Sequence, residues 1–167
     1  MKRFWLYVLA ILFMDQGAKI WIRSHLEVGD SIVIWDNVLS FTRYENSGVA
    51  FGLLEGYGRL FVPAALIVIG VVHYYRKQGL LCKGIGELGA SLLVGGGLGN
   101  AIDRVLFNKV TDFVSFTSRN GILNLADYAI NAGVLLIFID LIFIDRLRKK
   151  RETSAAAEAV ASIKSDS

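Results

Sequence analysis

The stretch Gly95–Asp127 reads GGGLGNAIDRVLFNKVTDFVSFTSRNGILNLAD. Among the polar side chains that interrupt its apolar residues are Asn100, Asp103, Arg104, Asp112, Asn124 and Asp127. Three carboxylates, one arginine and two amides therefore gather where one hydrophobic run ends and the next begins. Because surface loops of membrane proteins are often polar, only the rest of the chain can decide whether this cluster is a functional site.

The composition is typical of a protein that crosses a bilayer. The chain has 167 residues, 54% of them hydrophobic, with a single proline, and its mean hydropathy of +0.50 is high for a water-soluble protein. This length predicts one domain. The net charge of +3 would suit a nucleic-acid-binding protein, but the basic residues lie at the ends of apolar runs, where membrane topology requires them. We therefore expect no nucleic-acid partner.

Four apolar runs are long enough to cross a membrane as helices, at about 4–22, 58–76, 85–104 and 125–145. The first would be roughly 28 Å long at about 1.5 Å per residue. Lys2-Arg3 before this run imitates a secretory signal peptide, but no A-x-A-like cleavage site follows, so we interpret it as an uncleaved helix. The fold prediction is an all-α membrane protein with four transmembrane helices.

Lysine and arginine cluster before the first run, between the second and third, and after the fourth: Lys2, Arg3, Arg76, Lys77, Lys83, Arg146, Arg148, Lys149, Lys150 and Arg151. With four spans these clusters fall on one side, which the positive-inside rule makes cytoplasmic. Both termini are then cytoplasmic, and the loops 23–57 and 105–124 face outward. Residues 1–151 form the membrane domain, and the tail 152–167, without apolar periodicity, is expected to be disordered.

The first outer loop has the pattern of a β-hairpin. Ser31–Trp35 and Val38–Tyr44 are β-branched and aromatic runs on either side of a tight turn at Asp36-Asn37. Two strands alone are marginally stable in water. The hairpin is therefore expected either to lie against the membrane surface or to pair with the 110–117 segment, which also has strand character. This small extracytoplasmic β element completes the predicted fold.

The glycines of the opening stretch resemble a nucleotide-binding loop, but the strand-turn-helix context of such a loop is missing. Gly95 and Gly99 instead form a small-xxx-small face for close packing of membrane helices. The single cysteine, Cys82, and the two histidines, His25 and His73, show no metal-ligand spacing, and the histidines fall at opposite membrane faces. We expect no metal site and no cofactor.

Two further groups of polar residues precede this stretch. Asp15 and Lys19 stand four apart in the first helix and share one face. Ionisable residues inside a membrane normally face the bundle interior or a water-filled cavity, although a self-neutralising pair without function would also be tolerated. Asn46 and Gly48 follow the second predicted strand and offer an amide and an adaptable backbone. A plain strand-to-helix turn explains these two residues equally well.

Asp112 is the carboxylate without a structural explanation, because it lies among the apolar residues of VTDFV. Asp127 has one, since Asn124 and Asp127 have capping-box spacing at a helix start. Asp103 and Arg104 are adjacent, point in different directions and need not be partners. Two neighbouring carboxylates cannot both ionise easily, so one keeps a proton and polarises a carbonyl while the other activates water. This chemistry is amide hydrolysis without a metal or a covalent intermediate.

Five motifs in order resemble the lipoprotein signal peptidase family (signal peptidase II), the membrane aspartic endopeptidases of bacteria. They are Asp15-Gln16-x-x-Lys19; Thr42-Arg43-x-x-Asn46-x-Gly48-x-Ala50-Phe51; Gly99-Asn100-x-x-Asp103-Arg104; Val110-x-Asp112-Phe113; and Asn124-x-Ala126-Asp127. The resemblance covers essentially Phe4 to Arg151. Val49, Leu123 and Tyr128 depart from the family's usual residues, which changes the shape of the pocket but leaves each polar group in place.

The resemblance implies that Asp112 and Asp127 are the catalytic dyad. The family's substrate is a prolipoprotein with a diacylglyceryl-modified cysteine, cut just before that cysteine. The implied supporting and substrate-binding residues are Asp15, Lys19, Asn46, Gly48, Asn100, Arg104 and Asn124, whereas Asp103 is implied to be structural. The resemblance further implies a bacterial inner-membrane protein with its site near the outer face, in contact with lipid and inhibited by the cyclic peptide globomycin. We expect a monomer.

Two other classes of function remain open at this point. A small transporter or ion carrier using Asp15, Asp103 and Asp140 predicts acids spread through the membrane depth, whereas nearly all acids of this chain fall at one face. Asp140 is the exception, explained only by packing at a helix end or by reaching toward Arg146. A structural assembly factor predicts no dependence on a carboxylate pair.

Overall fold

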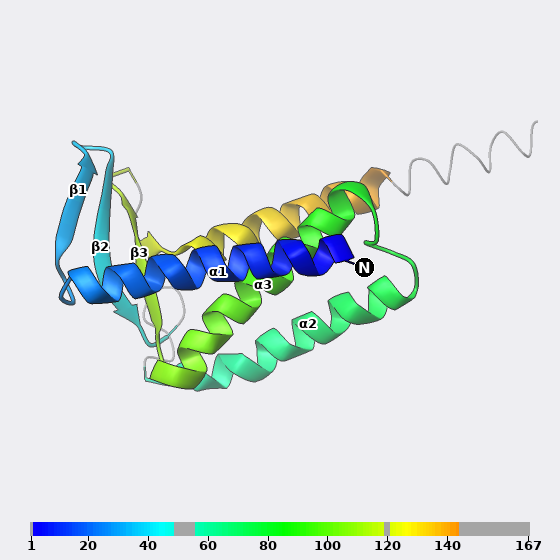
Figure 1. The fold of residues 1–167 in the computed structure, drawn as a ribbon, viewed down its shortest axis with the longest axis horizontal. Helices are drawn as coiled ribbons and strands as arrows, with labels where there is room; N and C mark the ends of the chain where they lie inside the picture. The colour runs from blue at the N-terminus through cyan, green and yellow to red at the C-terminus, as the bar shows by residue number, and fades with distance from the viewer. Residues whose placement is uncertain (1, 49–55, 119–120, 144–167) are drawn as a thin grey trace, which may run out of the picture.

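Four helices lie lengthwise in the computed structural model, which describes residues 2–48, 56–118 and 121–143 (Figure 1). They are α1 (Lys2–His25), α2 (Phe61–Lys77, preceded by the short helix η2, Gly58–Leu60), α3 (Gly84–Phe107) and a fourth helix, Leu125–Phe143. Each has the length and hydropathy of a membrane-spanning segment. The fold prediction is therefore confirmed. The predicted tail 152–167 and the basic cluster after the fourth run lie outside the described residues.

Two helices continue beyond the apolar runs that predicted them. α1 ends at His25 rather than near residue 22, and α3 ends at Phe107 rather than near 104. Ser24 Oγ donates to the Trp21 carbonyl at 2.8 Å, within the last turn of α1, and Asn108 closes α3 in the left-handed region with φ 59°. Hydropathy marks the edge of the bilayer, whereas backbone and side-chain hydrogen bonds decide where a helix ends.

Four antiparallel strands form one sheet in the order β1-β2-β3-β4. They are β1 (Ser31–Trp35), β2 (Leu39–Asn46), β3 (Val110–Phe116) and β4 (Ile122–Leu123). The predicted hairpin is confirmed, and the pairing of β2 with β3, seen in Tyr44 opposite Asp112, decides between the two placements left open. One detail differs: Asn46 ends β2 instead of following it, because the ladder continues to Val110.

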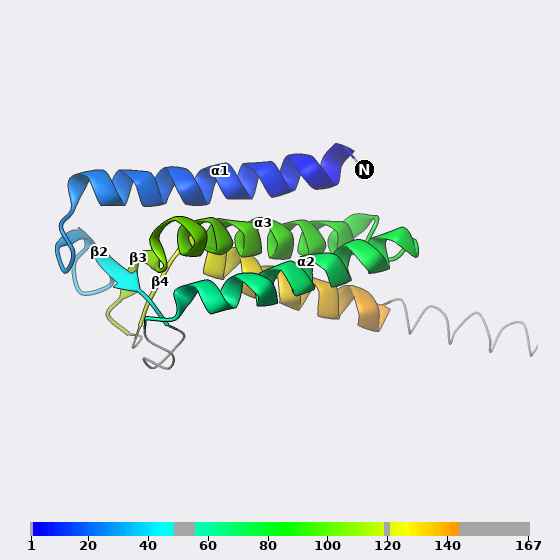
Figure 2. The ribbon, with the colours of Figure 1, turned by 90° about the horizontal axis from the view of Figure 1, so that it is seen from below.

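The sheet caps one end of the bundle (Figure 1). The start of α1 and the α2–α3 connection lie at the opposite end, as the view from below also shows (Figure 2). The chain thus crosses the length of the molecule with each helix. Polar residues from the sheet ends of α1, α3 and the fourth helix consequently meet β3.

Glycines let α3 approach its neighbours closely. A Cβ on Gly95 would lie 3.0 Å from Ile11 Cβ of α1, and one on Gly99 would meet the Asp15 carboxylate at 2.5 Å. Both positions are thus closed to larger side chains, as the predicted packing face requires. Large apolar side chains on the outside of the bundle are exposed, as expected for surfaces that face lipid: Leu6, Phe13, Ile20, Leu66, Ile67 and Phe138.

Candidate active site

Asn124 joins the two aspartates predicted to be catalytic. Its side-chain amide donates to Asp112 Oδ1 at 2.5 Å, from just before the fourth helix to the middle of β3. Its backbone N–H donates to Asp127 Oδ2 at 3.2 Å, and its Oδ1 accepts the Asp127 N–H at 2.9 Å. These reciprocal bonds are a capping box. The capping role expected of Asn124 and Asp127 therefore exists, and it also orients an amide toward Asp112.

Asn46 holds Asp112 from the other side. Its Nδ2 donates to Asp112 Oδ2 at 3.0 Å, while the Gly48 N–H donates to its Oδ1 at 3.1 Å. Both oxygens of Asp112 thus accept an amide N–H. The Gly48 bond orients the Asn46 side chain, because the amide oxygen must face the backbone donor and the nitrogen must face the carboxylate.

Asn100 performs the matching task for Asp127. Its Nδ2 donates to Asp127 Oδ1 at 2.8 Å, and its Oδ1 accepts a hydrogen bond from Lys19 Nζ at 2.9 Å. An ammonium group only donates, so the Asn100 amide can take one orientation here. Lys19 therefore controls the hydrogen bond to Asp127 without touching that carboxylate.

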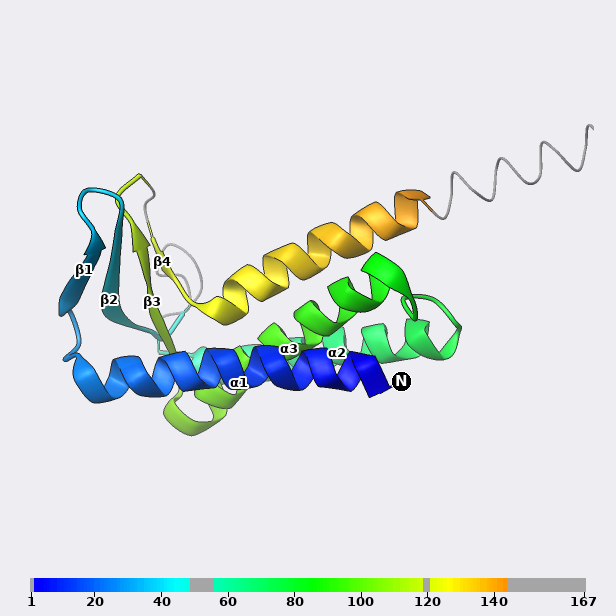
Figure 3. The same cartoon turned by 45° about the horizontal axis from the view of Figure 1, so that its top comes forward.

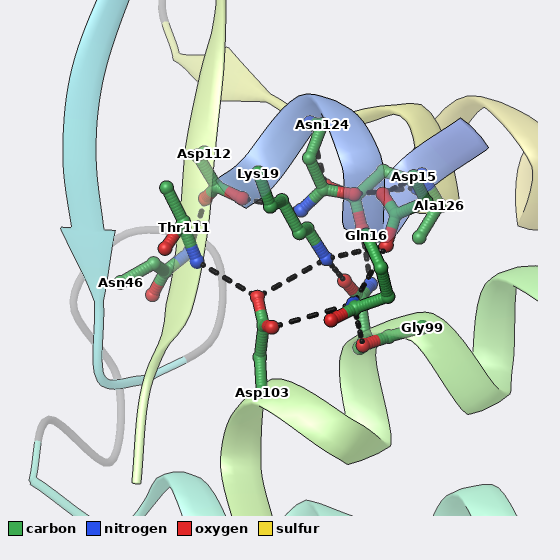
Figure 4. A network of polar contacts seen from close by, with 12 residues as sticks. Asp15, Gln16, Lys19, Asn46, Gly99, Asp103, Thr111, Asp112, Asn124 and Ala126 are labelled. Carbon is green, nitrogen blue, oxygen red and sulfur yellow. Dashed lines mark hydrogen bonds and ion pairs between the residues drawn. The ribbon is translucent and has the colours of Figure 1, made fainter. Parts of the chain in front are cut away.

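A buried ion cluster supports this arrangement (Figure 4). Lys19 Nζ lies 2.9 Å from Asp15 Oδ2 and 3.2 Å from Asp103 Oδ2, and all three side chains are fully buried. Asp15 Oδ1 also accepts the Ala126 N–H at 2.9 Å, one of the unpaired donors at the start of the fourth helix. Asp103 Oδ2 accepts the backbone N–H of Thr111. The cluster thus ties α1, α3, β3 and the fourth helix together.

Three residues of this network were not predicted. Gln16 Nε2 donates to the Gly99 carbonyl at 3.0 Å, and Arg23 Nη1 donates to Thr111 Oγ1 at 3.1 Å and lies 3.4 Å from Asp103 Oδ1. The position of Arg23 could have been predicted from its spacing, since it stands four residues after Lys19 on the same helix face. Gln16 belongs to the first of the five motifs, which gave it no role, and Thr111 carries no signal, because its partners come from distant segments.

Arg104 stands one turn after Asn100 on α3. Its guanidinium carbon lies 5.2 Å from the centre of the Phe61 ring, and the charges of Asp127 and Asp112 act on it. Within the described part of the chain its buried Nε has no hydrogen-bond partner. A buried donor without a partner is costly, which makes Arg104 a candidate ligand-binding residue.

The two aspartates differ in their surroundings. Asp112 is 2% exposed, whereas Asp127 is only partly buried. Burial, followed by the negative charge of Asp127, raises the pKa of Asp112 to about 7; hydrogen bonds from Asn46 and Asn124 oppose this rise. Asp112 therefore keeps its proton in weakly acidic solution and begins to lose it near neutral pH. Among the described residues, no group of three His, Cys, Asp or Glu could hold a metal ion.

A known protein family matches most of the chain. The model of the family described as signal peptidase (SPase) II matches residues 7–143. The chain belongs to the signal peptidase II family. The resemblance based on the five motifs is thereby confirmed, and the protein is a peptidase with several membrane-spanning helices.

Relatives within this family match nearly the whole chain. The lipoprotein signal peptidase of Halalkalibacterium halodurans is 36% identical over 155 residues, which cover 90% of this chain and 99% of the relative. That of Geobacillus kaustophilus is 33% identical over 91% of this chain and 100% of the relative. Two solved structures described as bacterial membrane enzymes are each 30% identical. Their TM-scores are 0.77 and 0.74; the alignments cover 85% and 84% of this chain, and 88% and 93% of theirs.

Proposed function

We propose that the protein removes signal peptides from diacylglyceryl-modified prolipoproteins, and that Asp112 and Asp127 activate the attacking water. The observation that carries this proposal is the position of Asn124, whose backbone and side chain hold one carboxylate each. A residue that only capped a helix would not need to reach a second aspartate on another element.

The surroundings of the two carboxylates suggest separate tasks. Asp112, with a pKa raised to about 7 mainly by burial, carries the proton that hydrogen-bonds to the scissile carbonyl. Asp127 is the ionised partner, held by Asn100 and Asn124, and takes a proton from the water. The resulting hydroxide attacks the carbonyl carbon. The proton then passes from Asp127 to the leaving nitrogen as the C–N bond breaks, which needs neither a metal nor a covalent intermediate.

Other residues bind the substrate or hold the dyad. The buried Nε of Arg104, without a partner in the described residues, is placed to donate to the substrate backbone. Asn46, with its amide oriented by Gly48, holds Asp112, and Asn100 holds Asp127. Asp15 and Lys19 support the site from α1. None of these tasks requires a cofactor.

The position of the site suits a lipid-anchored substrate. Its residues come from β3, from α1 and α3, and from the start of the fourth helix, and Figure 3 shows the sheet at one end of these apolar helices. A diacylglyceryl group can therefore enter the bilayer while its peptide bond reaches Asp112. By the positive-inside rule, this is the outer face of the bacterial inner membrane, and both termini are cytoplasmic. We expect cleavage just before the lipidated cysteine, inhibition by globomycin, and activity as a monomer.

Complementation tests the proposal. Wild type, Asp112→Asn and Asp127→Asn are expressed in cells that lack their own signal peptidase II, and prolipoprotein processing is followed by gel mobility. Wild type restores processing, and both variants fail, because Asn can neither supply the proton nor act as the base. Asp36→Asn, in the exposed hairpin turn, is the matched control and processes normally. Failure of wild type overturns the function, whereas normal processing by either dyad variant overturns the dyad alone.

A further inference from the structure

A cavity of about 400 Å³ lies between α2, α3 and the fourth helix, away from the sheet. Its walls are apolar, with α2 contributing Val68 and Val71, α3 Leu93, and the fourth helix Leu141. The volume falls in the range of about 300–1,000 Å³ typical of ligand pockets. Val71 is exposed on this face, so the cavity opens toward the surrounding lipid.

The α2–α3 connection closes the end of this cavity. Tyr75 lies near the end of α2, and Leu80 and Leu81 lie in the connection. All three line the cavity. Lys77 and Lys83 are exposed on either side of the connection. These two lysines, here called the basic rim, flank the connection whose Leu80 and Leu81 line the apolar space, near Tyr75, a residue type found at membrane interfaces.

The rim is held in a strained conformation. Leu81 has a φ of 52°, in the left-handed region that branched side chains rarely adopt. Arg76 binds the Leu81 carbonyl, lies 3.5 Å from Glu87 and stacks 3.8 Å from the centre of the Phe4 ring. Strained positions persist only where their surroundings hold them, and they cluster at ligand-binding segments.

We propose that this cavity binds one acyl chain of an anionic glycerophospholipid, whose headgroup is bound by Lys77 and Lys83. The inference goes beyond the peptidase function and does not depend on it. Basic pockets between membrane helices are suited to anionic headgroups. Of the acids at this end, Glu87 pairs with Arg76, and Asp140 packs against Gly86 in the first turn of α3.

The signal helix of a substrate is a second apolar segment that would fit this cavity. Charge distinguishes it from an anionic lipid. Signal peptides carry a positively charged segment before their apolar run. That segment has the same sign as Lys77 and Lys83 and would be repelled by them, whereas phosphatidylglycerol has the opposite sign. The rim therefore favours lipid over the substrate helix.

Native mass spectrometry of the full-length protein in detergent tests the site, with phosphatidylglycerol and phosphatidylcholine of identical acyl chains as probes. Wild type retains phosphatidylglycerol preferentially. Each of Lys77→Gln and Lys83→Gln weakens its binding about fivefold and leaves phosphatidylcholine unchanged. Val71→Trp fills the cavity and reduces the binding of both lipids. The matched controls, Lys109→Gln at the sheet end and Val134→Trp outside the cavity wall, bind as wild type does.

Two results would overturn the proposal. One is equal retention of the two lipids by wild type and by the lysine variants. The other is unchanged lipid binding by Val71→Trp together with a raised KM for a lipidated substrate peptide, which would assign the cavity to the signal helix. Because lipid retention is measured without turnover, a failed peptidase assay would leave this result interpretable. Thermal unfolding of each variant shows that it is folded.

Discussion

Lys19 balances the buried charges beneath the sheet. It contacts two carboxylates that are fully buried and hydrogen-bonds to Asn100. Buried ions are tolerated only when paired and hydrogen-bonded. The pair predicted from the spacing of Asp15 and Lys19 is therefore part of a larger network, because the same ammonium group also orients the amide on Asp127.

Replacing Lys19 by Met should destabilise the protein strongly. The substitution leaves the buried Asp15 and Asp103 without their shared partner, which typically costs about 3–5 kcal/mol. The free energy of unfolding, measured in detergent, should fall by this amount. Lys109→Met is the control: the Lys109 side chain is 42% exposed and lies 3.6 Å from Glu45, and a pair with one ion in contact with solvent contributes far less, about 0–1 kcal/mol. Equal stability of the two variants would contradict the role of Lys19.

The raised pKa of Asp112 predicts the pH dependence of catalysis. Because burial and the charge of Asp127 raise this pKa to about 7, the proton on Asp112 is present below about pH 7 and is lost above it. The rate constant kcat should therefore fall as pH rises through 7. The Asn46 hydrogen bond lowers the pKa, so Asn46→Ala should raise the pKa and move the decline to higher pH. A decline at the same pH in both proteins would refute this assignment.

Close contact between helices depends on glycine. A Cβ on Gly133 of the fourth helix would lie 2.7 Å from both Gly89 O and Leu93 N of α3, whereas one on Gly97 meets nothing within 4 Å. Gly133→Ala should therefore push the helices apart and destabilise the bundle by about 1–3 kcal/mol. Gly97→Ala should be neutral or slightly stabilising, because alanine favours helix. Thermal unfolding of the two variants measures the difference, and equal melting temperatures would count against this packing.

The strands show how far local patterns extend. β-Branched and aromatic runs identified β1, β2 and the strand character of β3, because each strand is several residues long. β4 is only two residues long, which is too short for a β-branched or alternating pattern to be recognised in the sequence. The pairing of β2 with β3 joins segments separated by more than 60 residues, with an irregularity between Phe41 and Tyr44. No local preference specifies such a register.

The topology of the whole chain can be measured with single cysteines. In a Cys82→Ser background, Asp36→Cys lies in the hairpin turn and Lys83→Cys in the α2–α3 connection, at opposite ends of the bundle. A membrane-impermeant maleimide should label Asp36→Cys in intact spheroplasts and Lys83→Cys only after permeabilisation. The opposite pattern would reverse the orientation and place the proposed site at the inner face.

Hydropathy, the basic clusters and the five motifs determined the four spans, the expected orientation and the family, because each is a property of residues along the chain. The same motifs nominated the two aspartates. Only the tertiary structure decided that Asn124 bonds to both carboxylates, that Lys19 acts on Asp127 through Asn100, and that Gln16, Arg23 and Thr111 belong to the network. Most of these bonds join α1, α3, β3 and the start of the fourth helix. Contacts between distant segments leave no periodicity in a sequence, so they appear only when the segments pack together.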